Sequence, residues 1–165
     1  MRKSIATYVE NGYGQVEPNH LSAQRTAQIY AQLPAASSIN VLENGQFVKY
    51  DYAKGEVNFT GAGEWMLVFN EVKLYGEKET YKDYAMTRES QVGGIIVPRV
   101  FKTNVGDIYT TNFVDGTEIK AGDTLSIKGN GIPTKGEETT GMIWEVAKVY
   151  TLADGQAAVK IMRIQ

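Results

Sequence analysis

The stretch Trp65-Met-Leu-Val-Phe-Asn-Glu-Val-Lys-Leu-Tyr75 carries the strongest strand pattern in the chain. Successive side chains of a strand point to opposite faces, and both faces are apolar at the start of this stretch. Strands that are covered on both sides show such nearly continuous apolar runs. We therefore expect a central strand over residues 65–75, with Trp65 in the core and with less exposed surface than any other element.

Short strand patterns, separated by turn residues, lie on both sides of this stretch. The dipeptides Asn44-Gly45, Lys54-Gly55 and Asp154-Gly155 are turn signals between short apolar runs. Many short strands with regular turns are typical of a small β-barrel or β-sandwich. The sequence therefore predicts an all-β body, with a first lobe over residues 37–97 and a second, barrel-like lobe over residues 98–165 that form one compact unit.

A polar stretch precedes this body: Gly14-Gln-Val-Glu-Pro-Asn-His-Leu-Ser-Ala-Gln-Arg-Thr-Ala-Gln-Ile-Tyr-Ala-Gln-Leu-Pro34. It has no run of large apolar residues, yet its composition is not that of a disordered segment. We expect residues 1–36 to form an extended arm that lies on another protein surface, so that removing residues 1–33 leaves a folded body. Alternation over residues 25–33 favours a strand, whereas the Ala and Gln content favours a short helix, and both remain open.

The arm supplies the candidate partner-binding residues. Tyrosine is enriched at interface hot spots, and tyrosines in the arm would have no core of their own to fill. An extended segment can also add to the edge of a partner's sheet, with alternate apolar side chains entering pockets. The predicted contact residues are Tyr8, Tyr13, Gln28, Ile29, Tyr30 and Leu33.

Composition narrows the class of protein. At 165 residues with 42% hydrophobic content, the chain suits one domain or two small lobes that share a core. A net charge of −2 offers no basic field for nucleic acid. The chain has no cysteine, which excludes disulfides and thiolate chemistry. We see no apolar segment of the kind that a signal peptide or a membrane span requires, and we expect no membrane partner.

The sequence offers no set of residues for catalysis or metal binding. His20 is the only histidine, so one chain cannot form a Ser-His-Asp triad or a multi-histidine metal site. The glycine-rich stretch Gly129–Gly141 has Glu137 and Glu138 where a phosphate-binding loop needs Lys and a hydroxyl. We therefore expect an exposed loop there, no nucleotide, no cofactor and no enzyme activity.

Three segments in order carry a family resemblance: the arm with Gln-Val-Glu-Pro-Asn and Arg-Thr-Ala-Gln-Ile-Tyr-Ala-Gln, then Leu42-Glu-Asn-Gly-Gln-Phe-Val-Lys-Tyr-Asp51, then Gly63-Glu-Trp-Met-Leu-Val-Phe-Asn-Glu-Val-Lys-Leu-Tyr75. Over roughly residues 10–75 the chain resembles the small capsid-associated proteins of tailed bacteriophages, of the decoration (cement) or head-fibre-base kind.

This resemblance implies a non-enzymatic virion protein that is made in the host cytoplasm. It would bind the lattice of the major capsid protein, as a trimer or another small homo-oligomer, with the arm lying across neighbouring capsid subunits. Two other classes of function stay open. One is a β-sheet module that binds carbohydrate or peptide, as in an adhesin, and the other is a small enzyme of unknown class. Packing of residues 10–36 away from the body would favour the virion protein.

Overall fold

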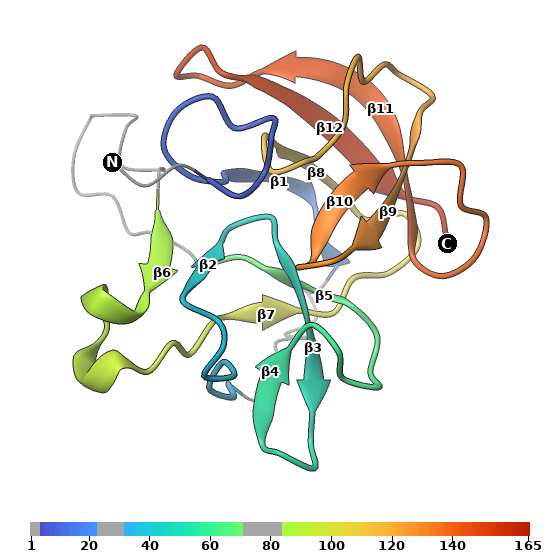
Figure 1. Cartoon of the computed structure of the whole chain (residues 1–165). Coiled ribbons are helices and arrows are strands. Elements are labelled where there is room, and N and C mark those ends of the chain that lie inside the picture. Colours follow the sequence, from blue (N-terminus) through green and yellow to red (C-terminus); the bar gives the residue numbers. More distant parts are fainter. Residues whose placement is uncertain (1–3, 23–31, 71–83) are drawn as a thin grey trace.

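The computed structural model describes residues 4–22, 32–70 and 84–165. Twelve strands in these ranges form three antiparallel sheets, joined by loops and by the short 3-10 turns η2 (Arg88–Ser90) and η3 (Val92–Gly94) (Figure 1). The predicted all-β fold is confirmed. In the part of the chain that the structure describes, no helix has the length and apolar character needed to cross a membrane.

The largest sheet has six strands in the order β1-β8-β12-β11-β9-β10, each antiparallel to its neighbours. The chain that follows β8 returns to β10, where the backbone N–H of Asp115 donates to Pro133 O (2.8 Å) and Lys135 N–H donates to Asp115 O (2.9 Å). This contact closes the sheet into a small barrel. Its strands are β1 (Val16–His20), β8 (Ile108–Thr111), β9 (Thr124–Lys128), β10 (Ile132–Lys135), β11 (Ile143–Thr151) and β12 (Ala157–Arg163).

The remaining strands form a four-stranded sheet and a two-stranded ribbon beside the barrel (Figure 1). The four-stranded sheet runs in the order β4-β3-β5-β7, and the ribbon pairs β2 with β6. The four-stranded sheet consists of β3 (Phe47–Asp51), β4 (Glu56–Asn58), β5 (Met66–Val68) and β7 (Val100–Phe101), and the ribbon of β2 (Val41–Glu43) and β6 (Ala85–Thr87).

The four-stranded sheet separates two hydrophobic cores, and the period-2 pattern of its strands explains why. Phe47 and Leu67 point to the barrel and join its core. Their neighbours Val48 and Met66 point the other way, into a second core. All four side chains are buried, as expected of strands with two covered faces.

The barrel core is built around aromatic side chains. Trp144 and Tyr109 are fully buried, and their rings meet edge to face with centroids 5.2 Å apart. Phe47 reaches the same tryptophan from the four-stranded sheet, with centroids 5.9 Å apart. Edge-to-face pairs add to the stability that area burial alone provides, so this cluster ties the small sheet to the barrel.

The strand predicted over residues 65–75 is shorter than expected. β5 covers only Met66–Val68, and it is an inner strand with all three residues buried, as predicted. Trp65 is half-buried and packs at the margin of the barrel core, where it lines a cavity. The prediction that Trp65 is a core residue is therefore wrong, because β5 begins after it and Trp144 occupies the core instead. Residues 71–75 lie outside the described part of the chain.

The prediction of an arm that packs poorly on its own body is wrong for the described residues of that segment. Val16–His20 forms β1, which pairs with β8 at the edge of the barrel sheet. Leu21 is buried in the barrel core, and Ala6 and Gln15 are also buried. The sequence pattern missed this packing because polar side chains, rather than an apolar stripe, hold the segment in place.

Glu43 is the centre of that polar packing. It is fully buried, and its two carboxylate oxygens accept hydrogen bonds from the backbone N–H of Ile5 (3.2 Å) and of Gly14 (3.0 Å). Gln15, the residue after Gly14, donates its backbone N–H to Asn112 Oδ1 (2.7 Å). Its side-chain NH₂ group donates to Asp154 Oδ2 (2.7 Å). The N-terminal segment thus supplies donors that the body's buried oxygens need.

Two further boundaries differ from the prediction. β7 belongs to the predicted second lobe in sequence, but it lies in the four-stranded sheet together with strands of the predicted first lobe. The predicted boundary after residue 97 is therefore not a boundary between two folded units. Within Gly129–Gly141, residues Ile132–Lys135 form β10 rather than a loop. Gln46 donates its side-chain amide to Asn130 O (2.7 Å) in the β9–β10 turn, which explains why this part is ordered against the body.

Candidate functional site

The structure separates the predicted partner-binding residues. Tyr8 packs partly buried against the barrel core, and Leu33 does the same against the second core. Tyr13 is half-buried. Tyr8 and Leu33 therefore contribute to the chain's own cores, which the polar surroundings of both residues in the sequence concealed, and their role in partner binding stays a prediction. The other three, Gln28, Ile29 and Tyr30, lie outside the described residues.

Both ends of the segment 23–31 are fixed to the body. On the N-terminal side, Ser22 donates its backbone N–H and its hydroxyl to the carboxylate of Asp107 (2.9 Å each), and Asn104 donates to Ser22 Oγ (2.6 Å). On the C-terminal side, Ala35 N–H donates to Ile96 O (2.7 Å). A chain segment held at both flanks has fewer accessible conformations than a free arm of the same length.

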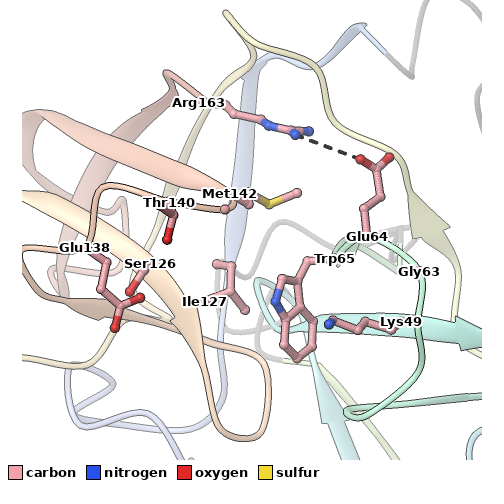
Figure 2. Close-up of a pocket in the computed structure, with 11 residues that line it drawn as sticks. Lys49, Gly63, Glu64, Trp65, Ser126, Ile127, Glu138, Thr140, Met142 and Arg163 are labelled. Atoms are coloured by element: carbon pink, nitrogen blue, oxygen red, sulfur yellow. Dashed lines mark ion pairs between the residues drawn. The ribbon is translucent and has the colours of Figure 1, made fainter.

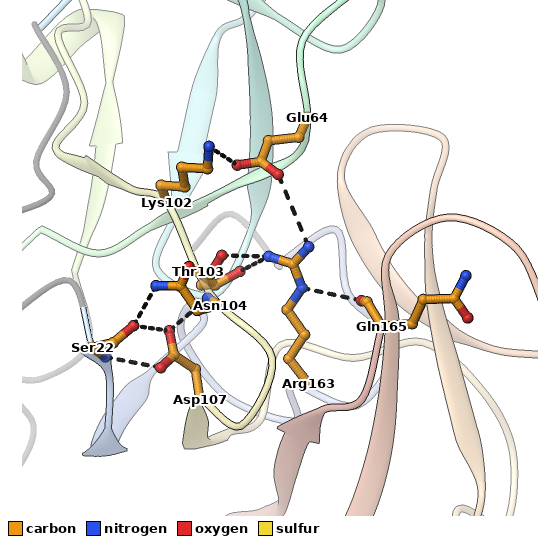
Figure 3. A network of polar contacts seen from close by, with 8 residues as sticks. All are labelled: Ser22, Glu64, Lys102, Thr103, Asn104, Asp107, Arg163 and Gln165. Atoms are coloured by element: carbon orange, nitrogen blue, oxygen red, sulfur yellow. Dashed lines mark hydrogen bonds and ion pairs between the residues drawn. The ribbon is translucent and has the colours of Figure 1, made fainter.

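A polar network continues from the first of these attachment points (Figure 3). Arg163, at the end of β12, donates to the carbonyl and the hydroxyl of Thr103 and forms an ion pair with Glu64 (Nη2 to Oε2, 3.9 Å). The Lys102 ammonium lies 3.1 Å from Oε1, the other oxygen of the same carboxylate. The network therefore joins the barrel to the loop before β5, next to a cavity.

The cavity, of about 430 Å³, lies where the four-stranded sheet meets the barrel (Figure 2). One wall comes from the loop before β5 and from β3, and the other from β9 and from the chain that leads into β11. Its size falls in the range of small-molecule sites. The lining residues are Lys49, Gly63, Glu64, Trp65, Ser126, Ile127, Glu138, Thr140, Gly141, Met142 and Arg163.

Trp65 and Lys49 form the wall from the small sheet. The Lys49 ammonium lies 4.6 Å from the centroid of the indole ring, a cation–π distance. Both side chains are half-buried, so they present an aromatic surface and a positive charge to the same space (Figure 2). This pair can hold a ligand that combines an apolar face with a polar or anionic group.

Glu138 and Ser126 stand on the opposite wall. The Lys128 ammonium, 2.7 Å from Glu138, and the nearby Ser126 hydroxyl hold the pKa of this carboxyl below its ordinary value, so Glu138 is ionised at neutral pH. The Ser126 hydroxyl is buried and makes no hydrogen bond of good geometry, although it lies close enough to affect Glu138. Because Ser126 lines the cavity, its hydroxyl can turn to bond a ligand there.

Sequence reasoning did not bring these residues together. Lys49, Trp65 and Ser126 come from three strands or their ends, far apart along the chain, and no local motif links them. The one available signal was the position of Trp65. This aromatic residue directly follows Gly63-Glu64, and this pair limits the apolar run expected of a core strand on its N-terminal side.

Within the described ranges, no three His, Asp or Glu side chains converge to hold a metal ion. Comparisons with protein-family models, with curated proteins and with solved structures gave no match. Function is therefore inferred from the residues and from the geometry above.

Proposed function

We propose that the chain is a non-enzymatic structural protein of a tailed-phage virion, and that it binds the lattice of the major capsid protein as a small homo-oligomer. The resemblance over residues 10–75 supports this role. The packing of residues 10–22 and 32–36 on the body does not support it, since an arm lying away from the body was expected of a virion protein. The single structural observation behind the proposal is the fixing of both ends of the segment 23–31, at Ser22 and at Ala35.

The free arm that the sequence suggested is replaced in this proposal by a segment whose two flanks are held by the body. The segment contains Gln28, Ile29 and Tyr30, three of the predicted contact residues. Tyrosine is enriched at interface hot spots. Because Ser22 and Ala35 are already fixed to the body, no binding energy is lost in ordering these flanks on the capsid.

Replacing Gln28, Ile29 and Tyr30 together by alanine is expected to weaken capsid binding by at least about 30-fold, the loss of a strong hot spot. The measurement is co-sedimentation of the purified chain with capsids assembled from the major capsid protein of the same genome. Circular dichroism of the triple variant is the folding control, so that a loss of sedimentation reports on the interface.

Tyr52→Ala is the matched control, since Tyr52 is an exposed tyrosine (71% accessible) on the β3–β4 hairpin. It should sediment with capsids as the unaltered chain does. Unchanged binding of the triple variant would remove the segment 23–31 from the capsid interface, and equal losses in both variants would show that the effect is not specific to this segment.

A second candidate function, a β-sheet module that binds carbohydrate or peptide, is favoured by the half-buried Trp65 in the polar cavity. Aromatic rings in such sites offer an apolar face, while the surrounding hydroxyls and charges fix the orientation of the ligand. We favour carbohydrate, because the polar groups are scattered around the ring rather than arranged along a free sheet edge.

Tryptophan fluorescence tests this candidate, because the two tryptophans differ in environment. Trp144 is fully buried, so a change on adding saccharide should come from Trp65. We expect saturable quenching or a spectral shift with the unaltered chain, and none with Trp65→Phe. A signal that persists in Trp65→Phe would contradict binding at the cavity.

A further inference from the structure

The two carboxylates of the cavity are already compensated by cations. Glu138 is paired with Lys128 at 2.7 Å, and Glu64 lies between Lys102 at 3.1 Å and Arg163 at 3.9 Å. All five groups are partly accessible to solvent, so each pair is weak on its own. Their charges nevertheless cancel locally, and neither carboxylate offers a free negative charge to a cationic ligand.

Lys49 stands apart from these pairs. Its ammonium contacts the Trp65 ring, and within the described structure it forms no ion pair. The charged residues that line the cavity are Lys49, Arg163, Glu64 and Glu138, and Lys49 is the one among them that no ion pair of the described structure neutralises. An anionic ligand group near Lys49 would therefore be attracted to the cavity.

We propose that the cavity binds an acidic saccharide, with the sugar carboxylate paired to Lys49 and an apolar ring face of the sugar packed against Trp65. This inference rests on the second candidate function and specifies its ligand class. The pairing would add a charge-assisted hydrogen bond, which is stronger than one between neutral groups.

The opposite wall supplies what the hydroxyl groups of a sugar need. The buried Ser126 hydroxyl is without a hydrogen bond of good geometry, and Thr140 adds a second hydroxyl at the rim. The ionised Glu138 can accept hydrogen bonds from sugar hydroxyls while it keeps its pairing with Lys128. Figure 2 shows Ser126, Thr140 and Glu138 on the side of the cavity opposite Trp65, with the Ser126 hydroxyl beside the Glu138 carboxylate.

Calorimetric titration of the full chain with matched saccharides tests this inference. The acidic probes are trigalacturonate and 3′-sialyllactose, and the neutral ones are galactotriose and lactose. At least one acidic probe should bind about tenfold or more tightly than its neutral counterpart, as expected for a hydrogen bond to a charged group. The difference should shrink as the ionic strength rises, because salt screens partly exposed charges.

Lys49→Met keeps the aliphatic stem and removes the charge, so it should reduce acidic binding to the neutral level. Lys148→Met is the control, since Lys148 is exposed on β11 and outside the cavity lining. Equal affinity for acidic and neutral probes would overturn the charge inference and leave saccharide binding intact. Preference for triglutamate would assign the cavity to acidic peptide instead, and no binding at all would remove both cavity roles without affecting capsid attachment.

Discussion

Glu43→Gln is expected to lower the free energy of unfolding by about 1–3 kcal/mol, because a buried backbone donor left without its acceptor is costly. Both carboxylate oxygens accept a backbone N–H, from Ile5 and from Gly14. Glutamine has nearly the same shape, but it puts an NH₂ group against one of these two donors. Urea unfolding followed by circular dichroism measures the change.

Glu10→Gln is the matched control, since Glu10 is exposed in the same N-terminal segment and should shift the stability by less than about 0.5 kcal/mol. A Glu43→Gln variant as stable as the control would show that the N-terminal segment is not held by this carboxylate. The same contacts revise the expectation for removal of residues 1–33: the truncated body should be destabilised, because Glu43 would lose both donors.

Gly131→Ala is expected to cost about 3–5 kcal/mol, the sum of a severe overlap and a left-handed backbone. Gly131 has φ +75°, and an added Cβ would lie 1.8 Å from the carbonyl oxygen of Phe47. That backbone cannot move away easily, because Phe47 N–H donates to Gly131 O at 2.8 Å and its side chain is fully buried. Thermal and urea unfolding should both show the loss.

Gly129→Ala separates the overlap from the backbone strain. Gly129 also has positive φ (+49°) in the same turn, but an added Cβ there would meet nothing within 4 Å. It should lose only about 1–2 kcal/mol. Similar losses in the two variants would mean that the β9–β10 turn is not packed closely against β3.

Much of the fold that could be predicted from the sequence came from its turn residues. Asp154-Gly155 joins β11 to β12, and Lys54-Gly55 joins β3 to β4, both as predicted hairpins. Asn44-Gly45 is a turn as expected, but the strands it joins do not pair with each other, since β2 pairs with β6 and β3 with β4 and β5. Asn44 exchanges two hydrogen bonds with the backbone of Asn70 instead, and nothing local in the sequence indicates this.

The packing of the N-terminal segment could not be predicted from hydrophobic pattern for a related reason. Its attachment depends on polar groups, the buried Glu43 and Asn112 and the exposed Asp154, which a pattern of apolar residues does not reveal. The cavity was hidden in another way. Trp65 and Ser126 line the same cavity only because the four-stranded sheet packs against the barrel. The packing of the sheet on the barrel depends on the whole topology.

An electron cryomicroscopy image of the native particle tests the proposed role most directly. We expect density for this three-sheet β body on the capsid shell, repeated with the symmetry of the lattice, with the segment 23–31 against the major capsid protein. Density for the body only elsewhere in the particle, its absence from the particle, or a body that meets the shell with the segment 23–31 turned away would contradict it.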